Sequence, residues 1–220
     1  MNKDWSELNK TMQAQLRKKD TFQAGLETLF ALRNQLMETI LSFRDRLTPA
    51  DFSAIPFMNA DGYHSKTVAY SLWHIFRIED IVAHTLISGD EQVFFKGGYR
   101  ERMNAPIITT GNELKKQQIA DFSAQLDLDA LFAYLSEVKE STETMLRGLS
   151  FEDLKRKIPG ERKTALQALH VVSEDESAFW LIDYWCGKDV RGLIQMPFSR
   201  HWIMHIEASM KIRDKIRPMA

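Results

Sequence analysis

Apolar residues recur every three or four positions along almost the whole chain, and strict alternation of apolar and polar residues over a strand-length window is rare. This spacing predicts an all-α protein. The first clear stripe begins near Asp20 and ends before Pro49, a residue that cannot continue a helix. Its apolar positions are Phe22, Leu26, Leu29, Phe30, Met37, Ile40 and Leu41.

Four further helices are predicted from the same pattern. The second runs from an N-cap at Ser65 to Gly89 and is apolar on most of its sides, so we expect it to be central. The others cover residues 128–146, 164–186 and 199 to about 216. We expect an up-and-down four-helix core, or a close variant, built from the first, second, third and last of these helices.

Two segments lie outside this core. Residues 1–19 are predicted to form an N-terminal helical arm, separate from a bundle domain of residues 20–220. The arm carries a single apolar stripe, which must be buried either on the same bundle or on a second subunit, so we expect a homodimer. That stripe consists of Trp5, Leu8, Met12 and Leu16. The excursion over residues 90–125 is long enough to be a functional loop, and the capping-box spacing of Thr110 and Glu113 predicts a short helix within it.

The charge balance narrows the range of partners. The 220 residues include 29 Lys and Arg against 30 Asp and Glu, a formal charge of −1, which leaves no broad basic field for a nucleic acid. No apolar run approaches the roughly 20 residues of a membrane span. The single cysteine, Cys186, suits a reducing compartment. We therefore expect a cytoplasmic protein that binds neither nucleic acid nor membrane, in which Cys186 is an apolar filler rather than a nucleophile.

The candidate chemistry lies in three histidines. His201 and His205 are one helical turn apart, so their side chains project within about 40° of each other and can converge on one metal ion. The spacing alone is weak evidence, because two histidines so spaced are more often satisfied core or rim residues than metal ligands. His74 lies in the most apolar helix, where a polar ring needs a partner. Three imidazoles would leave a fourth position open for water or substrate, as in catalytic zinc sites.

The remaining histidines have simpler interpretations. His64 and His84 each lie ten residues from His74, off its helical face, so surface or loop positions are predicted for both. His170 and Glu174 are one turn apart, which indicates either an ordinary helix pair or an outer contact that orients a ligand.

Neighbours of the three histidines also bear on the site. Trp202 stands where a zincin would have its glutamate, and no histidine follows a glutamate by three residues as in di-iron bundles, so both of those motifs are excluded. Trp73, Trp180, Trp185 and Trp202 are expected mostly in the core, and Trp73 and Trp202, which each adjoin a predicted ligand, are candidates for the wall of a pocket. Glu79 and Asp80 are expected to be solvated charges by default, with a salt bridge near Arg77 or to a neighbouring helix as the alternative for Glu79.

Two motifs identify a family. From Trp73 to Asp80 the chain reads W-H-I-x-R-x-E-D, and its last helix contains H-x-x-x-H. With these motifs on the second and last helices, the sequence resembles the DinB-like superfamily of metal-dependent enzymes over about residues 20–217. The resemblance implies a four-helix bundle, often a homodimer, that holds a zinc or nickel ion with three histidines. In this chain these are His74, His201 and His205.

The resemblance implies less about the reaction. Family members include thiol-dependent S-transferases and isomerases that use thiols such as bacillithiol or mycothiol. We expect a divalent metal site that activates water or a low-molecular-weight thiol, in a hydrolase or thiol S-transferase acting on a small molecule. The alternative is a non-catalytic helical bundle that binds metal or a protein partner. No residue is identified as a general acid or base. Metal affinity is expected to fall below about pH 6.5, where imidazole becomes protonated.

Overall fold

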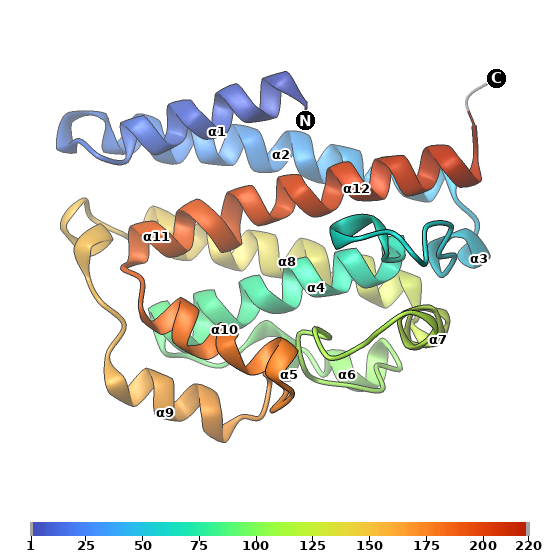
Figure 1. Ribbon diagram of the computed structural model, residues 1–220. Helices are drawn as coiled ribbons and strands as arrows, with labels where there is room; N and C mark the ends of the chain where they lie inside the picture. The colour runs from blue at the N-terminus through green and yellow to red at the C-terminus, as the bar shows by residue number, and fades with distance from the viewer. Residues whose placement is uncertain (1, 219–220) are drawn as a thin grey trace.

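The computed structural model describes residues 2–218 and is 72% helical, which confirms the all-α class. Four long helices form the core: α2 (Phe22–Arg46), α4 (Val68–Asp80), α8 (Leu128–Arg147) and α12 (His201–Ile216). In Figure 1, α2 and α12 lie side by side above α4 and α8. Within residues 2–218 no strand forms, and the only β-bridge is an isolated one. The same residues contain no helix with the length and apolar character needed to cross a bilayer.

The helices do not simply alternate in direction. Side-chain contacts join residue 76 of α4 to residue 134 of α8 and residue 84 to residue 141, so these two helices run parallel. The chain makes this possible because residues 90–127 cross back along the bundle before α8 begins. The crossover contains α5 (Val93–Lys96), α6 (Tyr99–Arg102) and α7 (Gln117–Gln125). The bundle is therefore a variant of the up-and-down core, in which a crossover joins the parallel helices α4 and α8.

α4 is the central helix, as predicted. Its N-cap is Thr67, rather than the expected Ser65, and the Thr67 hydroxyl accepts a hydrogen bond from the backbone N–H of Tyr70 at 3.0 Å. All thirteen of its residues are buried. The helix continues as a π-helix, Ile81–Ser88, and ends at Gly89, whose φ of 76° favours glycine.

The last helix is entered through a widened turn. α11 (Val190–Gln195) leads into the π-helix Met196–Arg200, and the N–H of His201 donates to the carbonyl of Met196 rather than to that of Pro197. Pro197 has no N–H to give, so the chain passes this point without a complete set of α-helical hydrogen bonds. α12 begins immediately afterwards with His201 as its first residue.

The N-terminal arm forms α1 (Lys3–Gln15) and packs on α2 of its own chain. Trp5, Met12 and Leu16 are buried there. The stripe is therefore covered without a second subunit, and it gives no support to the predicted homodimer. The division into an arm and a bundle domain stays a prediction.

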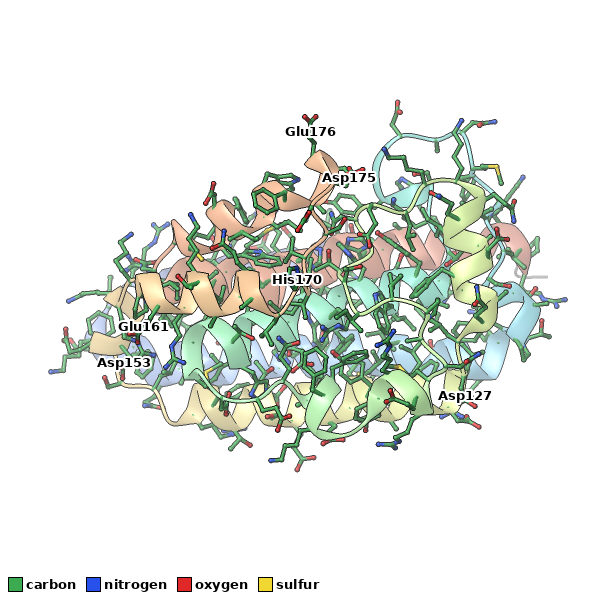
Figure 2. The ribbon with its side chains drawn as sticks, turned by 90° about the horizontal axis from the view of Figure 1, so that it is seen from below. Asp127, Asp153, Glu161, His170, Asp175 and Glu176 are labelled. Carbon is green, nitrogen blue, oxygen red and sulfur yellow. The ribbon has the colours of Figure 1, made fainter. Side chains whose placement is uncertain are left out.

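The helix predicted over residues 164–186 is in fact two helices, α9 (Gly160–Ala168) and α10 (Glu176–Cys186). His170 has a φ of 50°, which no α-helix permits, and the Asp175 side chain caps α10 by accepting from the N–H of Ser177. Figure 2 shows His170 beyond one end of α9 and Asp175 at the start of α10. The break between α9 and α10 allows α10 to run in a different direction from α9.

Short helices complete the chain. They are η1 (Lys19–Thr21), α3 (Pro49–Phe52), η2 (Gly62–His64) and η4 (Glu152–Lys155). The short helix predicted after Thr110 does not start there, because Thr109, and not Thr110, bonds to the Glu113 side chain, and the next helix begins at Gln117.

Candidate metal centre

The structure brings the three predicted histidines together. His74 projects from the middle of α4, and His201 and His205 project from the first two turns of α12, which packs against it. The ring centroids are 5.0 Å apart for His74 and His201 and 4.9 Å for His74 and His205. Those of His201 and His205 are 4.6 Å apart. One ring nitrogen from each residue lies within 4.8 Å of the other two. Ligands of a tetrahedral zinc ion are about 3.4 Å apart, so small rotations of the rings suffice to close the set.

The His74 ring is held in one orientation by a backbone carbonyl. Its Nδ1 lies 2.8 Å from the carbonyl oxygen of Thr110. A carbonyl can only accept, so Nδ1 carries the proton and Nε2 keeps its lone pair. This is the outer contact that orients a metal-binding imidazole in many sites.

The loop that supplies this carbonyl, residues 108–111, is attached to α4 by a row of side chains. Tyr70, Trp73, His74 and Arg77 lie on one face of α4, and each bonds to a carbonyl of the loop. The bonds of the other three reach Gly111 at 2.9 Å, Thr109 at 3.1 Å and Ile108 at 2.8 Å, respectively. The W-H-x-x-R part of the motif thus fixes the segment that orients His74.

His201 and His205 have buried nitrogens without partners. Nδ1 of His201 and both ring nitrogens of His205 are buried and make no hydrogen bond within residues 2–218. Buried polar atoms of this kind are rare and require an explanation. The expected carbonyl or carboxylate contact is thus present for His74 and absent for His205. Three neutral imidazoles with free lone pairs match the donor set that zinc and similar borderline metals prefer, so the residues fit a divalent metal ion.

The electrostatics keep these rings neutral. Burial lowers the pKa of His74 to about 4, against a smaller opposing effect of the Thr110 carbonyl, and the Lys66 charge lowers it further. Burial lowers the pKa of His201 and His205 well below the usual value, with a further contribution from the neighbouring imidazoles. Neutral imidazole is the metal-binding form, so proton competition is expected at a lower pH than 6.5.

A buried ion pair supports the α12 side of the site. Glu79 is not solvated as expected, because it receives two bonds from Arg33 at 2.7 and 2.9 Å and one from Nε1 of Trp202 at 2.8 Å. The Arg33 guanidinium also lies over the Trp202 ring. Burial is the largest single effect and lowers the pKa of Arg33, but the charges and hydrogen bonds of Glu79 and Glu143 together outweigh it, so the pKa is raised. Arg33 lies among the apolar positions of the predicted first helix, and a charged residue there is the feature of the sequence from which a buried ion pair could have been predicted.

Asp80 is also buried rather than solvated. It pairs with Arg77 at 3.1 Å, accepts from the hydroxyl of Tyr134 at 2.8 Å and caps the start of α5 through the N–H groups of Val93 and Phe94. The consecutive acidic residues of the motif therefore tie α4 to two different parts of the fold.

The remaining candidates are not part of the cluster of three imidazoles. His64 is half-buried against Phe57. His84 is buried rather than on the surface, with Nδ1 2.7 Å from Asp90 and Nε2 3.0 Å from Ser141. It joins the end of the π-helix to α8.

Two further predictions concerned His170, Glu174 and Cys186. His170 and Glu174 are both exposed and lie outside any helix, and Nδ1 of His170 is 3.9 Å from a carboxylate oxygen of Glu174. They therefore form an ordinary surface pair, though not within a helix, and not a ligand contact. Cys186 is half-buried, and burial raises the pKa of its thiol, which disfavours a nucleophilic thiolate.

A cavity of about 240 Å³ opens beside the site, with His74 and His201 in its wall. The tryptophans that line it are Trp180 and Trp185 of α10, and not the predicted Trp73 and Trp202, which bond to Thr109 and Glu79 instead. Sequence periodicity could not reveal this wall, because α10 reaches the site only through the break in the predicted helix.

Comparison with known proteins supports the same assignment. A family model described as the DinB superfamily matches residues 64–177, more than half of the chain. The matched segment includes His74 and the loop that orients it, and it ends before α12. No curated protein matches the chain.

Proposed function

Because the chain belongs to the DinB superfamily, we propose that it is a metal-dependent enzyme in which His74, His201 and His205 hold a divalent metal ion, zinc or nickel. One observation carries the proposal: buried ring nitrogens from two helices converge, and those of His201 and His205 have no other partner. When bound, such a metal acts as a Lewis acid that lowers the pKa of water or of a low-molecular-weight thiol.

The residues of this chain prepare the site in three ways. The Thr110 carbonyl keeps the proton of His74 on Nδ1, so its Nε2 keeps the lone pair that would bind a metal. Burial keeps all three rings neutral over the physiological range. The adjacent cavity gives a small molecule access to the His74 and His201 side of the cluster. A reducing compartment such as the cytoplasm suits this chemistry, because a thiol substrate stays reduced there.

A non-catalytic metal site is the second candidate. It is favoured by the wall of the cavity, which includes no Asp, Glu or Lys that would act as a general acid or base. In that case the metal stabilises the fold by joining α4 to α12, and no substrate is turned over.

Metal analysis tests the proposal. The full chain is purified without an affinity tag from medium supplied with zinc and nickel, alongside His74→Ala and the matched control His64→Ala. We expect about one metal ion per chain in the wild type and in His64→Ala, and at least a tenfold loss in His74→Ala. A metal-free wild type, or equal metal content in the two variants, would contradict the three-histidine site.

Turnover then separates the two candidates. Metal-loaded wild type is assayed for hydrolysis of ester and amide substrates and for transfer of a thiol to an electrophile, with His201→Ala as the inactive control. A metal that raises the melting temperature, with no turnover in either assay, would favour the non-catalytic site.

A further inference from the structure

The cavity beside the three imidazoles is lined by uncharged residues. Apart from His74 and His201 its lining residues carry aromatic rings, apolar side chains or an amide, among them Tyr63, Asn112, Trp180 and Tyr184. None of them carries a formal charge at neutral pH. The volume of about 240 Å³ is below the roughly 300–1,000 Å³ of pockets that enclose drug-sized ligands, so the occupant is smaller.

Charged groups that contact the lining residues do not line the cavity themselves. The Lys188 ammonium lies over the ring of Tyr184 at 4.2 Å, outside the cavity. The Lys66 ammonium lies over the ring of Tyr70 at 5.0 Å and lines a separate surface groove. Arg200 is close enough to lower the pKa of Tyr63, but burial of the phenol has the larger effect and raises that pKa, so Tyr63 stays neutral. An ionised ligand in the cavity would lose its hydration without gaining a counter-charge from the wall.

The wall offers aromatic surface and few hydrogen-bonding groups. The indole N–H of Trp180 is already used, because it donates to the carbonyl of Ser177 at 3.0 Å. The Trp180 ring meets that of Tyr184 edge to face at a centroid distance of 5.5 Å. Asn112 differs: its Oδ1 accepts from the Thr110 hydroxyl at 2.7 Å, which leaves the NH₂ group free to donate.

We propose that the cavity binds an uncharged, mainly aromatic small molecule of about two rings, whose single acceptor group faces the Asn112 amide. The inference rests on the proposed function, since it assigns the substrate class of the same site. If the inference is right, the protein binds a neutral ligand more tightly than a charged ligand of the same shape, and this preference depends on residues in the wall of the cavity.

Equilibrium dialysis with two matched probes tests this requirement. The probes are 2-acetylnaphthalene, which is neutral, and 2-naphthoate, which has nearly the same shape and one negative charge. The full chain is used after removal of metal with a chelator, so that the carboxylate cannot be captured by a metal ion. We expect 2-acetylnaphthalene to bind saturably and at least tenfold more tightly than 2-naphthoate. Equal binding, tighter binding of 2-naphthoate, or no saturable binding of either probe would overturn the inference.

Two neighbouring substitutions place the binding site. Trp180 lines the cavity and is 51% exposed, whereas Phe179, next to it on α10 and 44% exposed, does not line it. Because both side chains are half in solvent, replacement by Ala should leave the fold intact. Trp180→Ala should weaken 2-acetylnaphthalene binding about fivefold or more, and Phe179→Ala should leave it unchanged. Equal effects would place the probe outside the cavity and overturn the inference.

The two proposals fail separately. Metal content decides whether the three histidines form a metal site, and the probes are compared in protein without metal. A metal-free wild type that still prefers 2-acetylnaphthalene would leave the inferred selectivity standing and remove the proposed function.

Discussion

Replacing Glu79 by Gln should destabilise the protein by about 3 kcal/mol, because it leaves the Arg33 charge buried with one counter-charge removed. Glu79 is fully buried and accepts three charge-assisted bonds, two from Arg33 and one from Trp202. Breaking a buried pair of this kind costs about 3–5 kcal/mol. We expect the lower end, since Arg33 keeps its bonds to Glu143 at 3.0 Å and to the Phe198 carbonyl at 3.1 Å.

Urea unfolding of metal-free protein at pH 7 measures this change. For a domain of this size, 3 kcal/mol corresponds to a fall in melting temperature of about 6–12 °C. The matched control is Glu152→Gln, which removes an exposed i,i+3 ion pair with Lys155. Such a pair contributes less than about 1 kcal/mol, so the control should unfold like the wild type. Because Trp202 adjoins His201, Glu79→Gln should also weaken metal binding.

A double variant completes the test. In Arg33→Met, Glu79→Met no buried charge of the pair is left alone, so it should be more stable than either single variant. If the stability losses of the two single variants simply add in the double variant, the view that this pair is buried and interdependent is refuted. A loss below about 1 kcal/mol in Glu79→Gln would refute it as well.

Three further outcomes are expected. In metal-free protein the pKa of His74 is lowered to about 4, against about 6.5 in the unfolded chain, so the unfolded chain binds the proton first as the pH falls. The stability due to His74 is therefore complete above pH 6.5 and falls as the pH drops towards 4, by about 2 kcal/mol at pH 5. Urea unfolding of His74→Asn should show a shallower fall in stability between pH 6.5 and 5 than the wild type, and identical slopes would contradict this expectation. His84→Ala should lower stability by about 2 kcal/mol, since it removes buried bonds to Asp90 and Ser141, yet should keep the metal content of the wild type; loss of the metal would make His84 part of the site. Deleting residues 2–16 should lower the melting temperature, because Trp5 and Met12 are buried on their own bundle. The predicted homodimer should still be seen by analytical sedimentation of the shortened chain. Dissociation of the shortened chain to a stable monomer would instead assign the arm to the dimer interface.

Helical periodicity was sufficient to find the bundle helices and two of the three histidines that converge in the candidate site. His201 and His205 share a helical face because they are four residues apart, and this local relation holds wherever the helix packs. The third, His74, was identified as a polar ring in a helix apolar on most sides, which required only the assumption that this helix is central.

The predictions of helix bounds and of exposed charges were wrong where capping or burial overrides the local sequence pattern. The apolar spacing over residues 164–186 favoured one helix, but the Asp175 cap and the left-handed backbone of His170 divide it. Glu79 and Asp80 look solvated in sequence because they are charged, and only the positions of Arg33 and Arg77 beside them account for their burial.

The sequence alone determined which residues carry the candidate chemistry, since residue type and helical spacing are local properties. The tertiary structure decided their state. It brought α4 against α12, placed the Thr110 carbonyl on His74, withdrew water from three imidazoles and turned α10 to form an uncharged wall. Each of these depends on segments far apart in the chain, because desolvation and hydrogen bonding act through space and leave no regular trace in the order of residues.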